Sequence, residues 1–297
     1  MFPLSIKLKM EHNLSSATAK NLGLAPYRDQ IVTAIQEQLV DFGDKNVLRD
    51  GCEYALMNGG KRVRPAIVLA LAEALGGKPA IHPALAIEYF HTASLVADDL
   101  PCMDDDDERR NKPSVHKVYG ETLALLVSYA LIAAGYGCIE KGGRGLLNAD
   151  RVVALALQNS AYNTGLLGAT GGQFLDIYPP DLSLPTILEV IHKKTVSLFE
   201  ITFVFGWLFG GGSEERLPLV KKAASHYGTA FQIADDLGDM EQDSKNERLI
   251  NLANLLGKEE AERMLEEEIA SYKVTMSGLG LENSVLFTLA DELSQSY

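Results

Sequence analysis

The segment PALAIEYFHTASLVADDLPCMD, residues 83–104, joins a long apolar run to a cluster of aspartates. Apolar residues recur in the run at three- and four-residue spacing, which is typical of a helix packed into a core. Asp98 and Asp99 end the run, and Asp104 follows a break at Pro101, so the chain can fold back and bring these carboxylates together. Carboxylates are costly to bury or crowd unless a partner neutralises them. The segment therefore predicts a cation site at the end of a core helix.

A second aspartate cluster, in FQIADDLGD at residues 231–239, ends another helical run. On a helix, Gln232, Asp235, Asp236 and Asp239 share one face, because they are three, four and seven residues apart. Converging carboxylates suit hard divalent cations, and Mg²⁺ usually completes its coordination with water and substrate phosphates. A solvated acidic helix face explains one such motif readily. Two clusters with basic neighbours instead favour a site that binds a diphosphate through metal ions.

Basic residues accompany both clusters. The segment NGGKRVRP, residues 58–65, places Lys61 and Arg64 at a glycine-rich entry to a helix. Backbone amides and cationic side chains at such an entry favour an anion such as diphosphate. Arg109-Arg110 directly after the first cluster predicts a second anion site, and Lys193-Lys194 a third. Taken alone, each segment is also explained by helix capping or charge balance.

The helical period extends over almost the whole chain, and no alternating strand pattern persists. Helices are expected over residues 28–40, 47–57, 64–75, 83–99, 115–139, 150–167, 184–206, 218–240 and 258–272. This pattern predicts an all-α protein, a single large helical bundle of about ten helices with a site in its core. We expect one domain over residues 1–297, with about the first 20 residues as an N-terminal extension.

Composition excludes several classes of protein. The formal net charge of −13 argues against a nucleic-acid partner, which would need a basic surface. Three cysteines without CxxC spacing indicate neither a zinc site nor a disulfide framework, so we expect a reducing compartment, the cytoplasm. Residues 122–139 carry no charge and just reach spanning length. Their polar residues and the flanking Glu121 and Glu140 favour a buried core helix, so no stable membrane insertion is expected.

Five segments in this order, GGKRVRP, DDLPCMDDDDERRNKPSVHKVYGE, GATGGQFLD, HKKT and FQIADDLGD, resemble the motifs of the trans-polyprenyl diphosphate synthases. The likeness runs from about Arg28 to Leu256. The first motif has four residues between its aspartate pair and its last aspartate. This spacing resembles that of the bacterial and plant-plastid farnesyl and geranylgeranyl diphosphate synthases. The resemblance implies an isoprenoid-synthase bundle with a central active-site cavity, a homodimer and three Mg²⁺ ions between the two motifs.

The resemblance also implies residue roles. The metal ions would be held by Asp98, Asp104 and Asp235, with Asp99, Asp236 and Asp239 acting through water or through neighbouring groups. The allylic diphosphate would be bound by Arg109, Lys194, Gln232 and Lys245, the last standing in a shortened loop. Isopentenyl diphosphate would be bound by Lys61, Arg64, His91 and Arg110. Thr195 and Gln232 would present oxygen atoms near the developing allylic cation.

The implied reaction is a head-to-tail, trans condensation of isopentenyl diphosphate with an allylic diphosphate, which releases diphosphate. Ala97, Ala93, Phe90 and Ala86 share one face of the helix that ends in the first motif. A chain growing down this face would meet Phe90 as the first bulky side chain, which predicts geranylgeranyl diphosphate as the product. Farnesyl diphosphate is the alternative product. The same spacing would also be found if these four residues were ordinary core residues and another helix set the depth of the pocket.

Two other classes of function share part of this pattern. A class I terpene cyclase also ionises allylic diphosphates, but it needs no second diphosphate site and its second metal motif normally mixes Asn, Ser and Glu. A non-catalytic regulatory subunit would tend to lose the acidic motifs. Both aspartate motifs and GGKRVRP are present, which favours the prenyltransferase.

Overall fold

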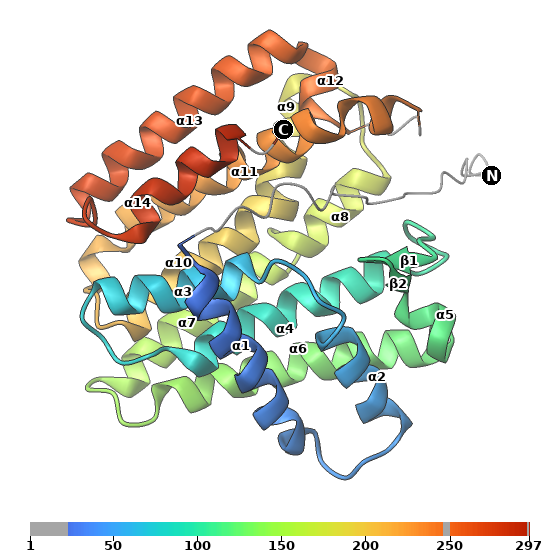
Figure 1. Ribbon diagram of the computed structural model, residues 1–297, viewed down its shortest axis with the longest axis vertical. Coiled ribbons are helices and arrows are strands. Elements are labelled where there is room, and N and C mark those ends of the chain that lie inside the picture. The colour runs from blue at the N-terminus through green and yellow to red at the C-terminus, as the bar shows by residue number, and fades with distance from the viewer. Residues whose placement is uncertain (1–22, 246–249, 296) are drawn as a thin grey trace.

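Helices form nearly all of the chain in the computed structural model, which describes residues 23–245, 250–295 and 297 (Figure 1). The expectation of an all-α fold is confirmed. The expected extension over residues 1–20 and the side chain of Lys245 lie outside the described residues. The expectation of one domain over the whole chain stays a prediction.

The first half of the chain contains α1 Ala25–Gln38, α2 Val47–Leu56, α3 Val63–Ala74, α4 Ile81–Asp98, β1 Glu108–Arg109, β2 Lys112–Pro113, α5 Val115–Tyr119 and α6 Glu121–Gly143. The second half contains α7 Ala149–Thr164, α8 Ala169–Ile177, α9 Leu184–Ile191, a π-helical turn His192–Val196, α10 Ser197–Phe209, α11 Leu217–Lys245, α12 Leu252–Leu256, α13 Lys258–Gly278 and α14 Val285–Leu289. Short 3-10 turns lie at Leu39–Phe42, Glu214–Arg216 and Ala290–Gln295.

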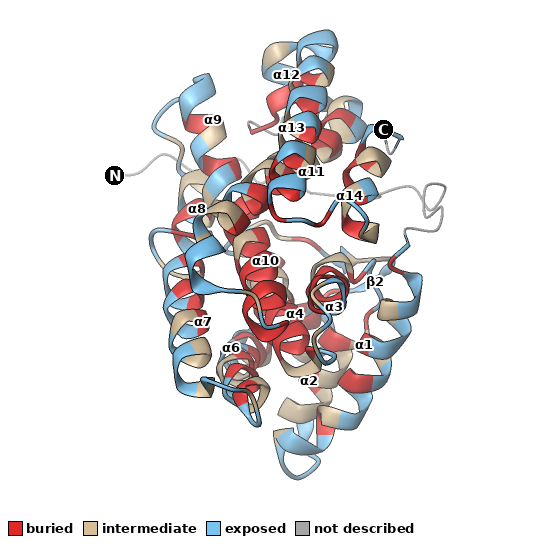
Figure 2. Ribbon diagram, turned by 90° about the vertical axis from the view of Figure 1, so that its left-hand side faces the viewer, coloured by how far each residue is buried: buried red, intermediate tan, exposed pale blue. Residues whose placement is uncertain are grey.

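Helix α10 lies at the centre of the bundle and is buried along its whole length (Figure 2). It packs against α3, α4, α7 and α11. A helix that is apolar all round is stable only when neighbours cover every face, as they do here. Gly206 allows the close approach to α3, because a Cβ there would lie 2.7 Å from the Cβ of Leu71. Helices α4 and α11, which carry the two aspartate motifs, both pack on this central helix.

The structure departs from the expected helices in several places. The run over residues 115–139 is broken at Gly120, whose φ of +86° ends α5 and starts α6. The run over residues 184–206 contains the π-helical turn, and α8 forms within a glycine-rich segment where no helix was expected. A two-residue hairpin, β1–β2, follows the first aspartate motif.

Helix α6 is only partly a core helix. It packs on α4, α2, α5 and α7. Only 39% of its most apolar 18-residue stretch is buried, although by length and composition it is the one helix in the described residues that could cross a membrane. The expectation of a buried core helix holds for the inner face of α6 and is wrong for its outer face, where Leu125, Leu126, Tyr129 and Ile132 are exposed.

Candidate active site

The first aspartate motif folds back on the end of α4, as its sequence predicts. The amide of Asp104 donates to the carbonyl oxygen of Asp98 at 2.9 Å. Burial raises the pKa of Asp98 to about 7, the ammonium of Lys194 opposes this shift, and the carboxylate of Asp104 adds to it. The turn therefore holds acidic groups close together at the end of a core helix, where a divalent cation would favour their ionised forms.

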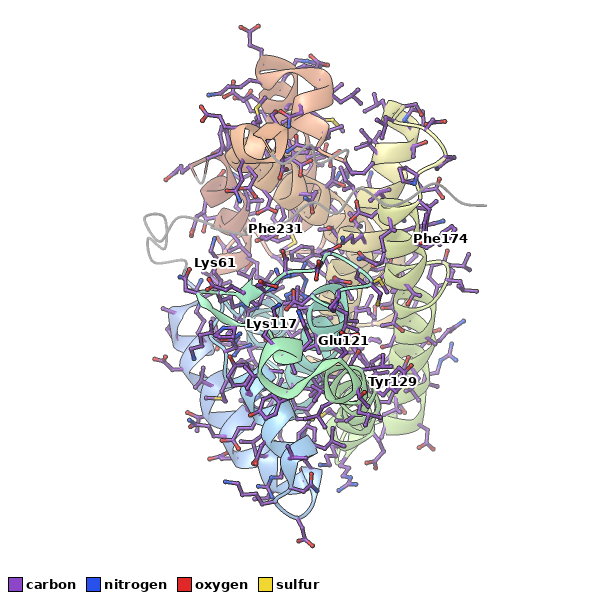
Figure 3. All side chains as sticks on the ribbon, turned by 90° about the vertical axis from the view of Figure 1, so that its right-hand side faces the viewer. Lys61, Lys117, Glu121, Tyr129, Phe174 and Phe231 are labelled. Atoms are coloured by element: carbon purple, nitrogen blue, oxygen red, sulfur yellow. The ribbon has the colours of Figure 1, made fainter. Side chains whose placement is uncertain are left out.

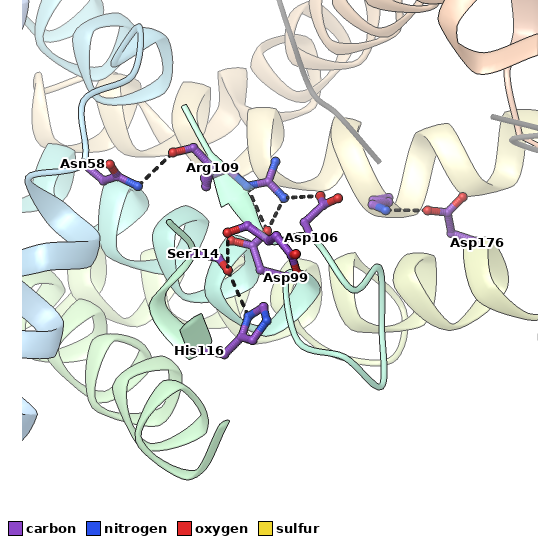
Figure 4. Close-up of polar contacts among 9 residues, drawn as sticks. Asn58, Asp99, Asp106, Arg109, Ser114, His116 and Asp176 are labelled. Atoms are coloured by element: carbon purple, nitrogen blue, oxygen red, sulfur yellow. Dashed lines mark hydrogen bonds and ion pairs between the residues drawn. The ribbon is translucent and has the colours of Figure 1, made fainter. Parts of the chain in front are cut away.

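Arg109 lies against carboxylates of the same motif (Figure 4). Its Nε donates to Oδ1 of Asp99 at 2.9 Å, and its Nη2 lies 3.1 Å from Oδ2 of Asp106. Both aspartate side chains are almost fully buried. The amide group of Asn58 donates to the Arg109 carbonyl oxygen at 3.1 Å and ties the hairpin to the glycine-rich segment. Arg109 is thus fixed beside the predicted metal ligands, whereas its contact with an allylic diphosphate stays a prediction.

The hairpin turn brings Arg110 to the glycine-rich segment 51 residues earlier in the chain. Arg110 and Asn111 form the turn with φ values of +57° and +62°, which favour Asn and Gly over most residues. The Arg110 guanidinium donates to the carbonyl oxygen of Gly59 at 2.5 Å. It fills the space beside Gly60, where a Cβ would lie 2.3 Å from its Cζ atom. A side chain at residue 60 would therefore displace this arginine.

Arg64 and His91 meet in the same region, with Nη1 of Arg64 3.5 Å from Nε2 of His91. The Arg64 guanidinium also lies 4.4 Å from the ring centroid of Phe199, a cation–π contact. Burial lowers the pKa of Arg64 to about 10, and it lowers the pKa of His91 well below the usual value, with the neighbouring arginines adding to this effect. His91 is therefore neutral, and Lys61 is exposed nearby (Figure 3). The four residues predicted to bind one diphosphate thus come from the glycine-rich segment, α3, α4 and the hairpin turn.

Lys194 lies on the π-helical turn and forms an ion pair with Asp176 of α8 (Figure 4). Gly172 allows the contact, because a Cβ there would lie 2.4 Å from the Lys194 nitrogen of the main chain. Burial alone would lower the pKa of Lys194, but Asp176, Asp98 and Asp104 outweigh it, and the pKa is raised. Lys194 is therefore a charged group that faces the first aspartate motif. Single π-helical turns are frequent at functional sites.

Thr195 connects this turn to the second motif. Its hydroxyl donates to Oε1 of Gln232 at 2.7 Å, and Nε2 of Gln232 donates to Oδ1 of Asp236 at 2.8 Å. The other Asp236 oxygen accepts the amide of Leu252 at 2.7 Å, at the start of α12. Asp236 is thus a buried acceptor that orients Gln232, while Asp235 and Asp239 share its helix. Lys194 and Thr195 together link the two motifs, and Asp235 also favours the charged form of Arg64.

The donors present fit a hard divalent cation, since each motif supplies several carboxylate groups, the first at the end of α4 and the second along one face of α11. A further group of possible metal ligands lies beside the first motif. Asp105, Asp107 and His116 offer ligand atoms within 4.8 Å of one another. Both arrangements are acidic, so the site can neutralise a positive ion without rearranging the helices.

Sequence reasoning missed several residues of this region. Asp176 follows Gln173 by three residues in GATGGQFLD. On a helix the two side chains would share one face, and this spacing could have indicated a polar site. Both polar side-chain atoms of Gln173 are buried and lack a hydrogen-bond partner within the described chain, as expected of a group that meets a ligand. The ion pair of Arg62 with Glu88 had no local signal, because its residues are 26 positions apart.

Comparison with known proteins identifies the family. Residues 45–249 match the family model described as polyprenyl synthetase. The heterodimeric geranylgeranyl pyrophosphate synthase large subunit 2 of Arabidopsis thaliana is 39% identical over 216 residues, which cover 70% of this chain and 56% of that protein. The putative chloroplastic geranylgeranyl pyrophosphate synthase 8 of the same plant is 36% identical over 238 residues, covering 77% and 65%. This chain thus spans less than two thirds of the length of either relative.

A solved structure, the geranyltransferase from Legionella pneumophila, superimposes with a TM-score of 0.82 at 26% identity, covering 92% of this chain and 96% of that one. The agreement extends over nearly the whole bundle described above. The family match also covers both aspartate motifs and the glycine-rich segment. The chain therefore belongs to the polyprenyl synthetase family.

Proposed function

We propose that this protein is a trans-prenyltransferase that condenses isopentenyl diphosphate with an allylic diphosphate and releases diphosphate. One observation carries the proposal: Lys194 and Thr195, adjacent on a π-helical turn, contact or face both aspartate motifs. A carboxylate cluster that faces a buried lysine, whose neighbour Thr195 bonds to the second motif, suits an allylic diphosphate. A separate group of basic residues, Lys61, Arg64 and Arg110, suits the diphosphate of a second substrate.

In the proposed reaction, the allylic C–O bond breaks and leaves a cation on the prenyl chain. Divalent cations held by Asp98, Asp104 and Asp235, three Mg²⁺ ions in our proposal, would draw negative charge from the departing diphosphate. Lys194 and Arg109 would hold the same diphosphate through charged donors. The Thr195 and Gln232 oxygens, already oriented by Asp236, would lie near the developing positive charge.

The second substrate would bind through its diphosphate to Lys61, Arg64 and Arg110, with neutral His91 as a further hydrogen-bonding group. Its double bond attacks the allylic carbon, so that a new C–C bond forms, and the carbon skeleton then loses one proton. The released diphosphate accepts that proton. No side-chain base is required, which agrees with a His91 that is buried beside arginines.

We propose geranylgeranyl diphosphate as the product. Ala93 is buried on the face of α4 that leads away from the first motif, and Phe90 lies one turn further along. One helical turn is about 5.4 Å, roughly one isoprene unit. The ring of Phe90 packs edge-on against Tyr136 of α6 at 5.0 Å between centroids, so two aromatic rings would close the channel. Farnesyl diphosphate remains the alternative product.

We further propose that two copies associate through the outer faces of α6 and α7. The exposed side chains that support this are Leu125, Leu126, Tyr129, Ile132, Leu157 and Tyr162. Contiguous exposed apolar surface of this kind marks an interface. One plant relative is named as a subunit of a heterodimer, and a different partner subunit is the alternative occupant.

For the compartment, we propose the cytoplasm. Three free cysteines, two of them buried, support a reducing environment. The putative synthase 8 bears the name chloroplastic, and a stroma is equally reducing, so imaging of the tagged protein in its own cells would decide between them.

The test of the function is an assay of the purified protein alone with Mg²⁺, isopentenyl diphosphate and dimethylallyl diphosphate. Chromatography of the dephosphorylated products gives their chain length directly. Linear trans prenols that require isopentenyl diphosphate support the proposal. Cyclic hydrocarbons formed from an allylic diphosphate alone would indicate a terpene cyclase, and turnover only after addition of a second subunit would indicate a regulatory role.

A further inference from the structure

Arg62 and Glu88 form an ion pair inside the bundle, beneath the glycine-rich segment. Nη1 of Arg62 binds Oε1 of Glu88, and its Nη2 donates to the carbonyl oxygen of Leu56. The two side chains are only 4% and 2% exposed. The hydroxyl of Thr92, one turn along α4, donates to the same Glu88 oxygen at 3.5 Å. A buried pair is weak evidence for stability by itself, because desolvation offsets the attraction.

The backbone of Arg62 shows what the pair holds in place. Arg62 has φ +49° and ψ 35°, the left-handed conformation, directly before the first residue of α3. Gly59 and Gly60 also have positive φ, which a glycine adopts freely, whereas a residue with a side chain, such as Arg62, is strained there. The bonds from Arg62 to Leu56 and Glu88 connect this strained residue to the last residue of α2 and to α4. They fix both ends of the turn between α2 and α3.

The groups around this turn are those assigned to isopentenyl diphosphate. Lys61 precedes Arg62, Arg64 follows it by two residues, and Arg110 lies on Gly60. Burial lowers the pKa of both Arg64 and Arg110, and the carboxylate of Glu88 is the foremost charge that opposes the shift in each. Like charges brought this close repel, so a buried carboxylate among them stabilises their charged forms.

We propose that Arg62 and Glu88 are positioning residues for the isopentenyl diphosphate site. Their ion pair fixes the turn at residues 58–63, so that Lys61, Arg64 and Arg110 stay arranged around the diphosphate before it binds. Neither residue needs to touch the substrate. The inference rests on the proposed function, because it assigns these cations to the second substrate.

The test compares Glu88→Gln and Arg62→Lys with the parent protein. Glu88→Gln keeps the shape and removes the charge, while Arg62→Lys keeps the buried charge but cannot bind Glu88 and Leu56 together. Glu268→Gln is the matched control, since Glu268 pairs with His226 at 2.6 Å between α11 and α13, away from the glycine-rich turn. Each variant is measured for KM of both substrates, for kcat, and by calorimetric titration with isopentenyl diphosphate alone.

We expect both variants to raise the KM and the calorimetric Kd for isopentenyl diphosphate about tenfold or more, the effect of losing a charged hydrogen bond that preorganises a site. The KM for the allylic substrate should change by less than about threefold, because no hydrogen bond in that site is lost. Glu268→Gln should lower Tm without changing either KM. If Glu88→Gln does not fold, Arg62→Lys decides the question by the same measurements.

Equal effects on both substrates, or lower Tm with unchanged isopentenyl diphosphate binding, would overturn the inference. An inactive parent protein would instead overturn the proposed function, and the titration separates the two failures. If the parent protein binds isopentenyl diphosphate and the Glu88→Gln variant binds it only weakly, the positioning role is supported even without turnover.

Discussion

The ring of Phe90 occupies the space that a side chain on Gly135 would need. A Cβ at Gly135 would lie 2.5 Å from the Cε1 atom of Phe90, so α4 and α6 pack closely only because this position lacks a side chain. Tyr136, the next residue of α6, contacts the ring edge and hydrogen-bonds to Thr164 at 3.2 Å between oxygens. Phe90 is therefore held from two sides, which suits a fixed floor for a hydrocarbon channel.

Product length should follow this floor. Ala93→Phe is expected to shorten the main product to fifteen carbons, and Phe90→Ala to lengthen it, because each change moves the first bulky side chain by about one helical turn of 5.4 Å. Chromatography of dephosphorylated products measures the outcome. Tyr89→Ala is the control, since Tyr89 is equally buried but packs on Phe42. Unchanged products in both Phe90→Ala and Ala93→Phe would show that another helix sets the depth.

Asp98→Asn and Asp235→Asn should each lower kcat roughly a thousandfold, because metal-assisted charge stabilisation contributes several kcal/mol. Both variants should fold, since the amide is isosteric and removes charge from a crowded site. Steady-state rates at saturating Mg²⁺ and circular dichroism check the two statements. Asp41→Asn, which breaks a peripheral ion pair with Lys141, is the control and should keep the parent rate. Near-normal turnover in either site variant would remove that residue from the metal ligands.

The two diphosphates should respond to different substitutions. Lys61→Ala is expected to raise mainly the KM for isopentenyl diphosphate, and Lys194→Ala mainly that for the allylic substrate. Measurements with one substrate varied at saturation of the other separate these effects. If each variant affects both KM values alike, the division into two sites is wrong or the sites are coupled.

Arg109→Ala should also destabilise the fold, unlike Lys61→Ala. Removal of the guanidinium takes the cation from the buried Asp99 carboxylate, and removing one partner of a buried ion pair typically costs about 3–5 kcal/mol. Denaturant unfolding of the magnesium-free protein measures this loss. Parent-like stability would mean that water or a neighbouring residue replaces Arg109.

The outer face of α6 should decide the oligomeric state. Leu126→Glu and Tyr129→Glu place a charge in the exposed apolar surface and are expected to give monomers in sedimentation velocity. Val274→Glu is the control, because Val274 is 74% exposed on α13, which is not one of the two helices proposed to form the interface. Parent protein that is already monomeric would contradict the proposed homodimer.

The three thiols should differ in reactivity. Burial raises the pKa of Cys52 and of Cys138 to about 11, above the usual range of a thiol, while Cys102 is exposed. Since the folded-state pKa is raised, the stability that these two thiols contribute is full below the unfolded value and is lost as pH rises through about 11. At pH 8 an alkylating reagent should therefore modify Cys102 first, as mass spectrometry of the digested protein would show. Fast labelling of Cys52 would contradict this order.

The sequence allowed the long helices to be predicted, but not the links between them. Apolar spacing locates α4, which ends at its carboxylates, and α11, which was expected to end at its aspartates but continues to Lys245. The hairpin β1–β2 has two residues in each strand, too few for a period, and depends on the positive φ of Arg110 and on a bond from Asn58. The pairing of Lys194 with Asp176 arises from helix packing, which no local pattern contains.

The π-helical turn at residues 192–196 also bears on how this chain can change in length. A π turn holds one residue more than an α turn, so it accommodates an extra residue while the helices on either side keep their register. Deleting one residue here would restore an α turn and leave α10, with Gly206 against α3, in its present orientation. Such a deletion would keep the core but move Lys194 and Thr195 from their present positions, so the function of the site, and not the packing of α10, restricts the length of this segment.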